Sequence, residues 1–182
     1  MRTRVSAGGR AIYASLKSPV GVIWVAASSR GIFLLTIGAD RERFEERLRR
    51  MRFRPRMGGG LAGEAARQLR EYFMGERTSF SLPLDLRGTP FQLAVWQTVM
   101  KIPYGETRSY RWVAEEVGRP RAARAVGRAL AANPVPIIVP CHRVVGSDGG
   151  LRGYSLGPGI KGLLLGLERG AKQRTKCEEH SI

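Results

Sequence analysis

Residues 121–145 read RAARAVGRALAANPVPIIVPCHRVV, and this stretch decides how the second half of the chain is expected to fold. Its first half, RAARAVGRALAAN, is rich in alanine and predicts a helix whose small side chains allow close approach to another surface. Asn133 stands immediately before Pro134, and a residue in that position avoids the helical conformation. The helix must therefore end at Asn133, the only asparagine of the chain, whose side chain can bond the released backbone groups.

The second half of the stretch, PVPIIVPCHRVV, predicts a buried strand over 137–139 that ends at Pro140. Cys141 then lies where a rigid strand gives way to a turn. A thiol has an ordinary pKa of about 8.5 and needs help to react near neutral pH, which His142 could give by accepting its proton. Neighbouring side chains of an extended chain diverge, so a relay between the two would run through a water molecule. On these residues alone, a reactive thiol and a buried inert thiol are equally good interpretations.

Two further helices are predicted just before this stretch. Thr89 followed by Pro90 marks a helix start, because threonine caps the first turn and proline suits its first position. The helix FQLAVWQTVMKI follows over 91–102, and a shorter one, SYRWVAEEVG over 109–118, is joined by a tight turn to the alanine-rich helix. Such a pair is typical of a helix-turn-helix. The arginines of the alanine-rich helix favour DNA binding over burial, because buried charges are costly.

The first half of the chain predicts a small unit of strands and helices. Its apolar runs between residues 11 and 38 are separated by turn signals and predict a three-strand antiparallel meander. The other expected elements are a helix over 40–51, a basic glycine-rich loop over 52–63, a helix over 64–75 and an edge strand over 79–86. The fold class is α+β, with an antiparallel-sheet domain (1–86), a mainly helical domain with a helix-turn-helix (87–170) and a flexible tail (171–182).

The net charge narrows the class of partner. Lysine and arginine number 31 against 15 acidic residues, and the resulting formal net charge of +16 attracts polyanions, above all nucleic acid. No apolar run approaches the ~20 residues that a membrane span needs, and the N-terminal stretch has no signal-peptide core. Cys141 and Cys177 cannot form a disulfide framework. The two cysteines and two histidines also lack the spacing of a zinc site.

Several motifs of the second half occur together in one known family. They are GETRSY (105–110), RAVG (124–127), AANPVPIIVP (131–140), PCHRVV (140–145) and GYS (153–155) before IKGLLLGLE. With these motifs the run from Phe91 to Glu168 resembles the O6-alkylguanine-DNA alkyltransferases, and the first half fits the more variable N-terminal domain of that family. The Pro-Cys-His-Arg motif in this setting is highly specific.

By that resemblance, four residues carry the chemistry. Cys141 would take the alkyl group from guanine O6, His142 would act on the thiol through a water molecule, and Glu168 would orient the imidazole. Asn133 would be the hinge that braces the helix-turn-helix against the active-site segment. Arg143 is expected to be structural, paired with a carboxylate.

The resemblance also implies a set of DNA contacts. Arg124 would enter the base stack and fill the gap left by a flipped nucleotide, and Tyr110 would press on the neighbouring phosphate. Tyr154 and Ser155 would line the base pocket, with backbone contacts from Val144. The narrow minor groove requires a small helix surface. The small residues Ala122, Ala123, Ala125 and Gly127 would form that surface. Arg128 would add a phosphate contact.

The implied function is DNA repair by direct reversal, an irreversible single-turnover transfer of an alkyl group from O6-alkylguanine in double-stranded DNA to Cys141. The resemblance further implies a cytoplasmic, prokaryotic monomer that needs neither metal nor organic cofactor. Leu156 stands where some members have glycine and would narrow the pocket. Two alternatives remain: a lesion-sensing minor-groove binder without transfer, and a Cys-His hydrolase. The hydrolase is disfavoured because no glycine-bearing elbow for an oxyanion hole surrounds Cys141.

Overall fold

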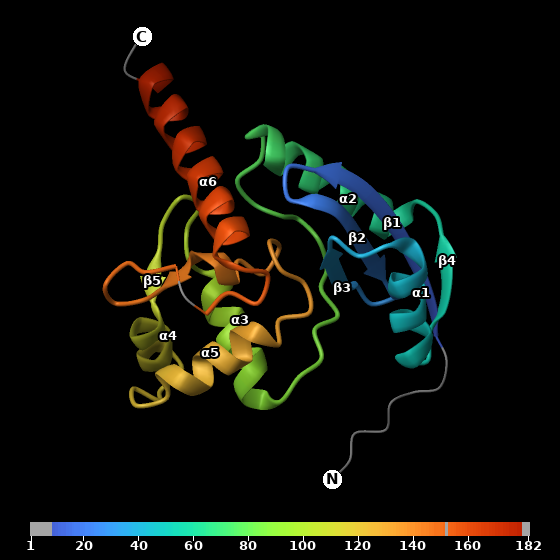
Figure 1. Cartoon of the computed structure of the whole chain (residues 1–182), viewed down its shortest axis with the longest axis horizontal. Helices are drawn as coiled ribbons and strands as arrows, with labels where there is room; N and C mark the ends of the chain where they lie inside the picture. The colour runs from blue at the N-terminus through green and yellow to red at the C-terminus, as the bar shows by residue number, and fades with distance from the viewer. Residues whose placement is uncertain (1–8, 152, 180–182) are drawn as a thin grey trace. The chain divides into compact units, whose positions relative to one another are not determined.

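The computed structural model describes residues 9–151 and 153–179 of the chain. The chain divides into two compact units (Figure 1). The N-terminal unit comprises the chain up to Glu71 together with Ser81–Leu86, and the C-terminal unit comprises Tyr72–Phe80 and the chain from Arg87 onward.

A four-stranded sheet with the order β3-β2-β1-β4 forms the frame of the N-terminal unit. The strands β1 (Arg10–Ser18), β2 (Gly21–Ala27) and β3 (Ile32–Ile37) pair antiparallel, which confirms the predicted meander. The strand β4 (Arg54–Met57) pairs parallel with β1. The sequence prediction of a loop over 52–63 was therefore wrong at β4, and the sheet is mixed rather than antiparallel.

One face of this sheet is covered by α1 (Arg41–Arg50), whose buried residues are Phe44 and Leu48. They pack in a core with Tyr13 and Trp24, and the rings of Trp24 and Phe44 stack with centroids 5.8 Å apart. Asp40 caps the helix, because its side chain accepts a hydrogen bond from the backbone N–H of Arg43.

Two other elements of the first half differ in extent from the sequence prediction. The helix α2 (Gly60–Met74) begins four residues before the expected helix over 64–75. The segment 79–86 makes only an isolated bridge between Leu84 and Ile32, instead of a full edge strand. Pro83 has no backbone N–H to donate, and its carbonyl accepts from the N–H of Ile32 at 2.8 Å.

Three short helices build the C-terminal unit: α3 (Pro90–Met100), α4 (Tyr110–Glu116) and α5 (Ala123–Ala131). Thr89 caps α3 and Pro90 is its first residue, as predicted, and Gln92 completes a capping box. Helices α4 and α5 pack on each other and on α3 (Figure 1), and the indole N–H of Trp96 donates to the carbonyl of Ala129 at 2.9 Å. The predicted pair of helices is thus anchored to α3.

The segment after α5 is not the regular strand predicted over 137–139. Ile137 has a left-handed φ of 74°, and a single bridge between Pro136 and Val139 closes a tight turn. The side chain of Asn133 folds this turn, because it accepts from the N–H of Val135 and donates to the carbonyl of Val139. The chain then enters the short 3-10 helix η1 (Cys141–Arg143).

The remaining elements complete the C-terminal unit. Two-residue strands β5 (Arg108–Ser109) and β6 (Val144–Val145) pair in parallel, and α6 (Pro158–Glu179) contacts η1. The flexible tail was predicted from residue 171 onward, but the chain is helical up to Glu179, the last residue of α6. The last three residues of the predicted tail lie outside the described residues. Within the part of the chain that the structure describes, no helix has the length and apolar character to cross a membrane.

Candidate active site and DNA-binding helix

The thiol of Cys141 lies at the first position of η1 and is only 4% exposed. Its backbone N–H donates to the carbonyl of Val139 at 2.8 Å, so the turn fixes the start of η1. Burial raises the pKa of the Cys141 thiol to about 11, although Asn133 and Lys161 act in the opposite direction. The resting thiol is therefore protonated at neutral pH, and it needs a base at the moment of reaction.

The amide of Asn133 joins the end of α5 to this thiol. Its Nδ2 lies 2.9 Å from the carbonyl oxygen of Val139 and 3.0 Å from Sγ of Cys141. Its Oδ1 accepts from the N–H of Val135 at 3.0 Å. One amide thus shapes the turn and also offers a hydrogen bond that favours the thiolate over the thiol.

The carboxylate of Glu168, on α6, is the centre of a buried hydrogen-bond network. Its own exposure is 0%, and it lies within 2.7 Å of Nε2 of His142. The other donors to it are Nε and Nη2 of Arg143 (3.0–3.2 Å), the hydroxyl of Tyr72 (2.8 Å) and the N–H of Gly105 (2.9 Å). The sequence prediction that Arg143 pairs with a carboxylate is confirmed.

This network fixes the protonation of His142. Burial opposes the charge of Glu168, but the hydrogen bonds from His142 and Arg143 and the positive charge of Arg143 outweigh it and hold the pKa of Glu168 at about 2. Burial lowers the pKa of His142, so its ring is neutral at pH 7. Because the ionised Glu168 can only accept, Nε2 of His142 must carry the hydrogen. The lone pair is then on Nδ1, which is buried and has no hydrogen-bond partner among the described residues.

Two members of the site were not found by sequence reasoning. Lys161, on α6, is 0% exposed, donates to the carbonyl of Val144 at 2.7 Å and lies 5.8 Å from the ring centre of Tyr110. Its position seven residues before Glu168 places both on one face of α6, which was a usable signal. Tyr72 lies 96 residues from Glu168 in sequence, and no pattern links them.

The phenols of Tyr110 and Tyr154 lie near the cysteine. Burial first, and then the Cys141 sulfur, raise the pKa of both hydroxyls above the ordinary value, so both can act as donors. A Cβ added at Gly153 would lie 2.8 Å from the hydroxyl oxygen of Tyr110, and Gly153 has a φ of 74°. Only glycine suits this close approach. Val144 is buried and Ser155 is exposed.

The helix α5 presents small residues and exposed arginines, as predicted. Arg124 and Arg128 are exposed, whereas Val126, Ala129 and Leu130 are buried. The half-buried small residues are Ala122, Ala123, Ala125 and Gly127. Ala122 is the N-cap residue, so α5 begins at Ala123, two residues after the start predicted at Arg121.

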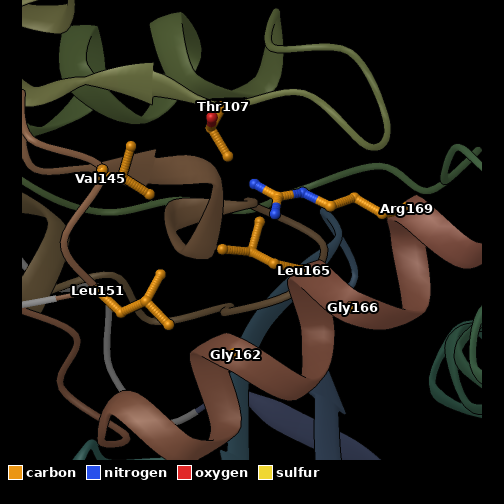
Figure 2. Close-up of a pocket in the computed structure, with 8 residues that line it drawn as sticks. Thr107, Val145, Leu151, Gly162, Leu165, Gly166 and Arg169 are labelled. Atoms are coloured by element: carbon orange, nitrogen blue, oxygen red, sulfur yellow. The ribbon is translucent and has the colours of Figure 1, made fainter.

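A cavity of about 350 Å³ lies between α6 and the loop after β6, and it is separate from the thiol. Figure 2 shows the guanidinium of Arg169 pointing toward Thr107, with Val145, Leu151 and Leu165 as the apolar wall. None of Cys141, His142 and Tyr154 lines it. Among residues 9–151 and 153–179, no three His, Cys, Asp or Glu side chains lie together so that they could hold a metal ion.

Comparison with known proteins gives matches over both halves of the chain. The family model "6-O-methylguanine DNA methyltransferase, DNA binding domain" matches residues 90–170, and "6-O-methylguanine DNA methyltransferase, ribonuclease-like domain" matches residues 11–86. A methylated-DNA–protein-cysteine methyltransferase of Methanosarcina barkeri is 45% identical over 86% of this chain and 96% of its own. Mycobacterium tuberculosis OGT, solved in complex with DNA, is 42% identical with a TM-score of 0.77, over 88% of this chain and 94% of that one.

Proposed function

The chain belongs to the 6-O-methylguanine DNA methyltransferase family, and from that premise we propose that it transfers one alkyl group from O6-alkylguanine in double-stranded DNA to Cys141. The observation that carries this assignment is the 3.0 Å contact between Nδ2 of Asn133 and Sγ of Cys141, beside a neutral His142 held by Glu168. A buried inert cysteine needs no neighbouring base and no amide aimed at its sulfur. This arrangement supports the reactive interpretation that the sequence left open.

Activation of the thiol begins with loss of its proton. We assign the acceptor as Nδ1 of His142, with a water molecule carrying the proton between the two side chains, since His142 and Cys141 are neighbours in sequence. As His142 becomes positive, the ionised Glu168 on its other nitrogen stabilises the imidazolium. Asn133 and Lys161 favour the thiolate as it forms, since both lower the pKa of Cys141.

The transfer is a single displacement at the alkyl carbon. An electron pair of the Cys141 sulfur forms the new S–C bond while the C–O6 bond breaks and its electrons remain on guanine. Guanine then takes up one proton, which balances the proton lost by the thiol. The product thioether carries no group that water readily displaces, so each molecule acts once. No metal or organic cofactor has a role in this balance.

The DNA contacts are assigned to α5 and the residues around the thiol. The alkylated base is buried in the duplex and must be flipped out, at a cost of a few kcal/mol. We assign Arg124 to fill the resulting gap, and its exposure on the small surface of α5 supports this role. Tyr110, Tyr154, Ser155 and the backbone of Val144 receive the base, and Arg128 adds a phosphate contact. All of these groups belong to one chain, so we propose a monomer that works on DNA in the prokaryotic cytoplasm.

The decisive experiment is mass spectrometry of the protein after incubation with a duplex that contains one O6-methylguanine. We expect one methyl group on the peptide that contains Cys141, none in the Cys141→Ala variant, and full transfer in the matched Cys177→Ala control. Cys141→Ala should still bind the duplex. A methyl group on Cys177, or wild-type protein that binds the lesion without gaining mass, would reject the assignment; the second result would leave the lesion sensor.

A further inference from the structure

Exposed arginines of the N-terminal unit differ in whether they pair with an acidic side chain. On α1, Arg43 pairs with Asp40, Arg49 with Glu45, and Arg50 with Glu46. A second set lies along one edge of the sheet, and no hydrogen bond or ion pair joins it to another side chain of the described residues. We call it the β4 edge, and it consists of Arg10, Arg52, Arg54 and Arg56. Arg47 on α1 and Arg70 on α2 are also exposed without such a partner, but they lie outside this edge.

Strand pairing brings like charges together at the β4 edge. In the parallel pair of β1 and β4, Arg10 lies directly beside Arg54, and Arg56 follows on the same face two residues later. Like charges opposite each other on neighbouring strands are destabilising. β4 is also the last strand of the sheet order (Figure 1), so within the described residues its outer edge pairs with no further strand. An anion lying across the strand would remove this repulsion.

The backbone just before β4 supplies an independent observation. Arg52 follows the C-cap of α1 with a left-handed φ of 63°, and the N–H groups of Arg52 and Phe53 donate to the carbonyls of Arg49 and Leu48. This is the turn in which glycine is usually found, because a side chain is strained there. The exposed side chain of Arg52 makes no hydrogen bond or ion pair with another side chain of the described residues that would offset this strain. Observed strain of this kind points to a role for the side chain.

We infer that the β4 edge is a second contact surface for the phosphate backbone of DNA, separate from α5. The charge of this edge selects the partner. Three of its guanidinium groups lie on β4 and the turn before it and the fourth on the neighbouring strand β1, and guanidinium binds phosphate in bidentate geometry. The family model for DNA binding matches residues 90–170 and leaves this edge out. Its contribution is independent of sequence and lesion, because phosphates are the same at every base pair.

The competing explanation is that these charges only prevent edge-to-edge pairing of sheets. That role requires charge at the edge but no anionic partner. The two explanations differ in their effect on DNA affinity. A phosphate contact releases counterions, and each one contributes about 0.9 to the slope of log affinity against log salt concentration.

The test compares two triple variants of the full chain with the same loss of charge. The first removes three of the four arginines of the β4 edge, with R10Q, R54Q and R56Q. The second removes three paired arginines of α1, with R43Q, R49Q and R50Q. Binding to an undamaged duplex is measured by fluorescence anisotropy at several salt concentrations. We expect the β4-edge variant to lower the magnitude of the salt slope by about 2 to 3, and the α1 variant to lower it by less than 1.

Equal changes in the two variants would show a general charge effect and overturn the inference, as would no change in either. Weaker solubility of the β4-edge variant without a change in slope would favour the edge-protection explanation. Thermal melting by circular dichroism checks that both variants are folded. Because undamaged DNA is used, the result does not depend on methyl transfer, and transfer at saturating DNA should be unchanged in the β4-edge variant.

Discussion

Nδ2 of Asn133 lies 3.0 Å from Sγ of Cys141, so a single amide connects the end of α5 with the thiol eight residues later. The same amide holds the turn through Val135 and Val139. A displacement of α5 on binding DNA would therefore be transmitted directly to the sulfur. One side chain thus joins helix α5, which we propose to contact the duplex, to the thiol that we propose to accept the alkyl group.

The Asn133→Asp variant separates the two uses of this amide. Aspartate keeps the oxygen that accepts from Val135, but it removes the donor to Cys141 and places a negative charge beside the sulfur. The pKa of Cys141 should rise further, and the rate of methyl transfer should fall by at least about tenfold, since a pKa change of one unit corresponds to about 1.4 kcal/mol. The measurement is single-turnover transfer at saturating DNA. A rate equal to that of the wild type would exclude a role for the amide at the sulfur.

The buried carboxylate of Glu168 predicts that loss of its cation costs more stability than loss of one neutral hydrogen-bond donor. Arg143→Leu leaves the carboxylate buried without its cation and should cost about 3 to 5 kcal/mol. Tyr72→Phe removes one of several donors to the same carboxylate and should cost about 1.5 to 3 kcal/mol. Urea unfolding measures both. A loss below about 1 kcal/mol for Arg143→Leu would mean that the carboxylate is not held as an anion.

Several helix ends were predictable because their signals are local. Thr89-Pro90 marked the start of α3, and Asn133-Pro134 marked the end of α5, within two residues. The charged helix α1 followed its apolar spacing. Such features depend on residues three or four apart, so one sequence is enough to reveal them.

The missed features depend on distant partners or on unusual backbone. β4 reads RPRM and has no apolar alternation, and it is a strand only because β1 lies beside it. Ile137 is β-branched, yet it takes a left-handed conformation that Asn133 imposes on the turn. Tyr72 reaches Glu168 across 96 residues. None of these contacts leaves a periodic pattern in the sequence.

The pKa of Glu168 gives a pH dependence of stability. Its value is about 2 in the folded protein and 4.5 ordinarily, so above pH 4.5 this group contributes about 3 kcal/mol to folding. As pH falls from 4.5 toward 2, the unfolded chain binds the proton first, and this stability is lost. Between pH 7 and pH 3 the wild type should lose about 2 kcal/mol more than Glu168→Gln. Urea unfolding at the two pH values measures the difference, and parallel losses in both proteins would contradict the assigned charge.

Gly127, on the small surface of α5, offers a test of close approach to DNA. A Cβ there would meet only the Tyr110 ring, at 3.8 Å, so Gly127→Ala should fit and should stabilise the helix by about 0.5 to 1 kcal/mol. Gly166→Ala on α6 meets no atom within 4 Å and is the matched control. Both variants should melt at higher temperature, but only Gly127→Ala should bind duplex DNA more weakly. Unchanged binding would place α5 outside the groove.

Arg52 is the position where stability and DNA binding should change in opposite directions. Replacing it with glycine relieves the left-handed backbone of φ 63°, which costs an L-residue about 1 to 2 kcal/mol, and the gain is reduced by the larger entropy of glycine in the unfolded chain. The free energy of unfolding of Arg52→Gly, measured in urea, should therefore be about 0.5 to 1 kcal/mol higher than that of the wild type. It should also lower the DNA salt slope by about 0.9, the effect of one phosphate contact. Arg52→Asn is the control, because asparagine tolerates this backbone without the charge, and it should share the loss of slope. If Arg52→Gly were more stable but had an unchanged salt slope of DNA affinity, Arg52 would not contact DNA, and DNA binding would not explain its strained backbone.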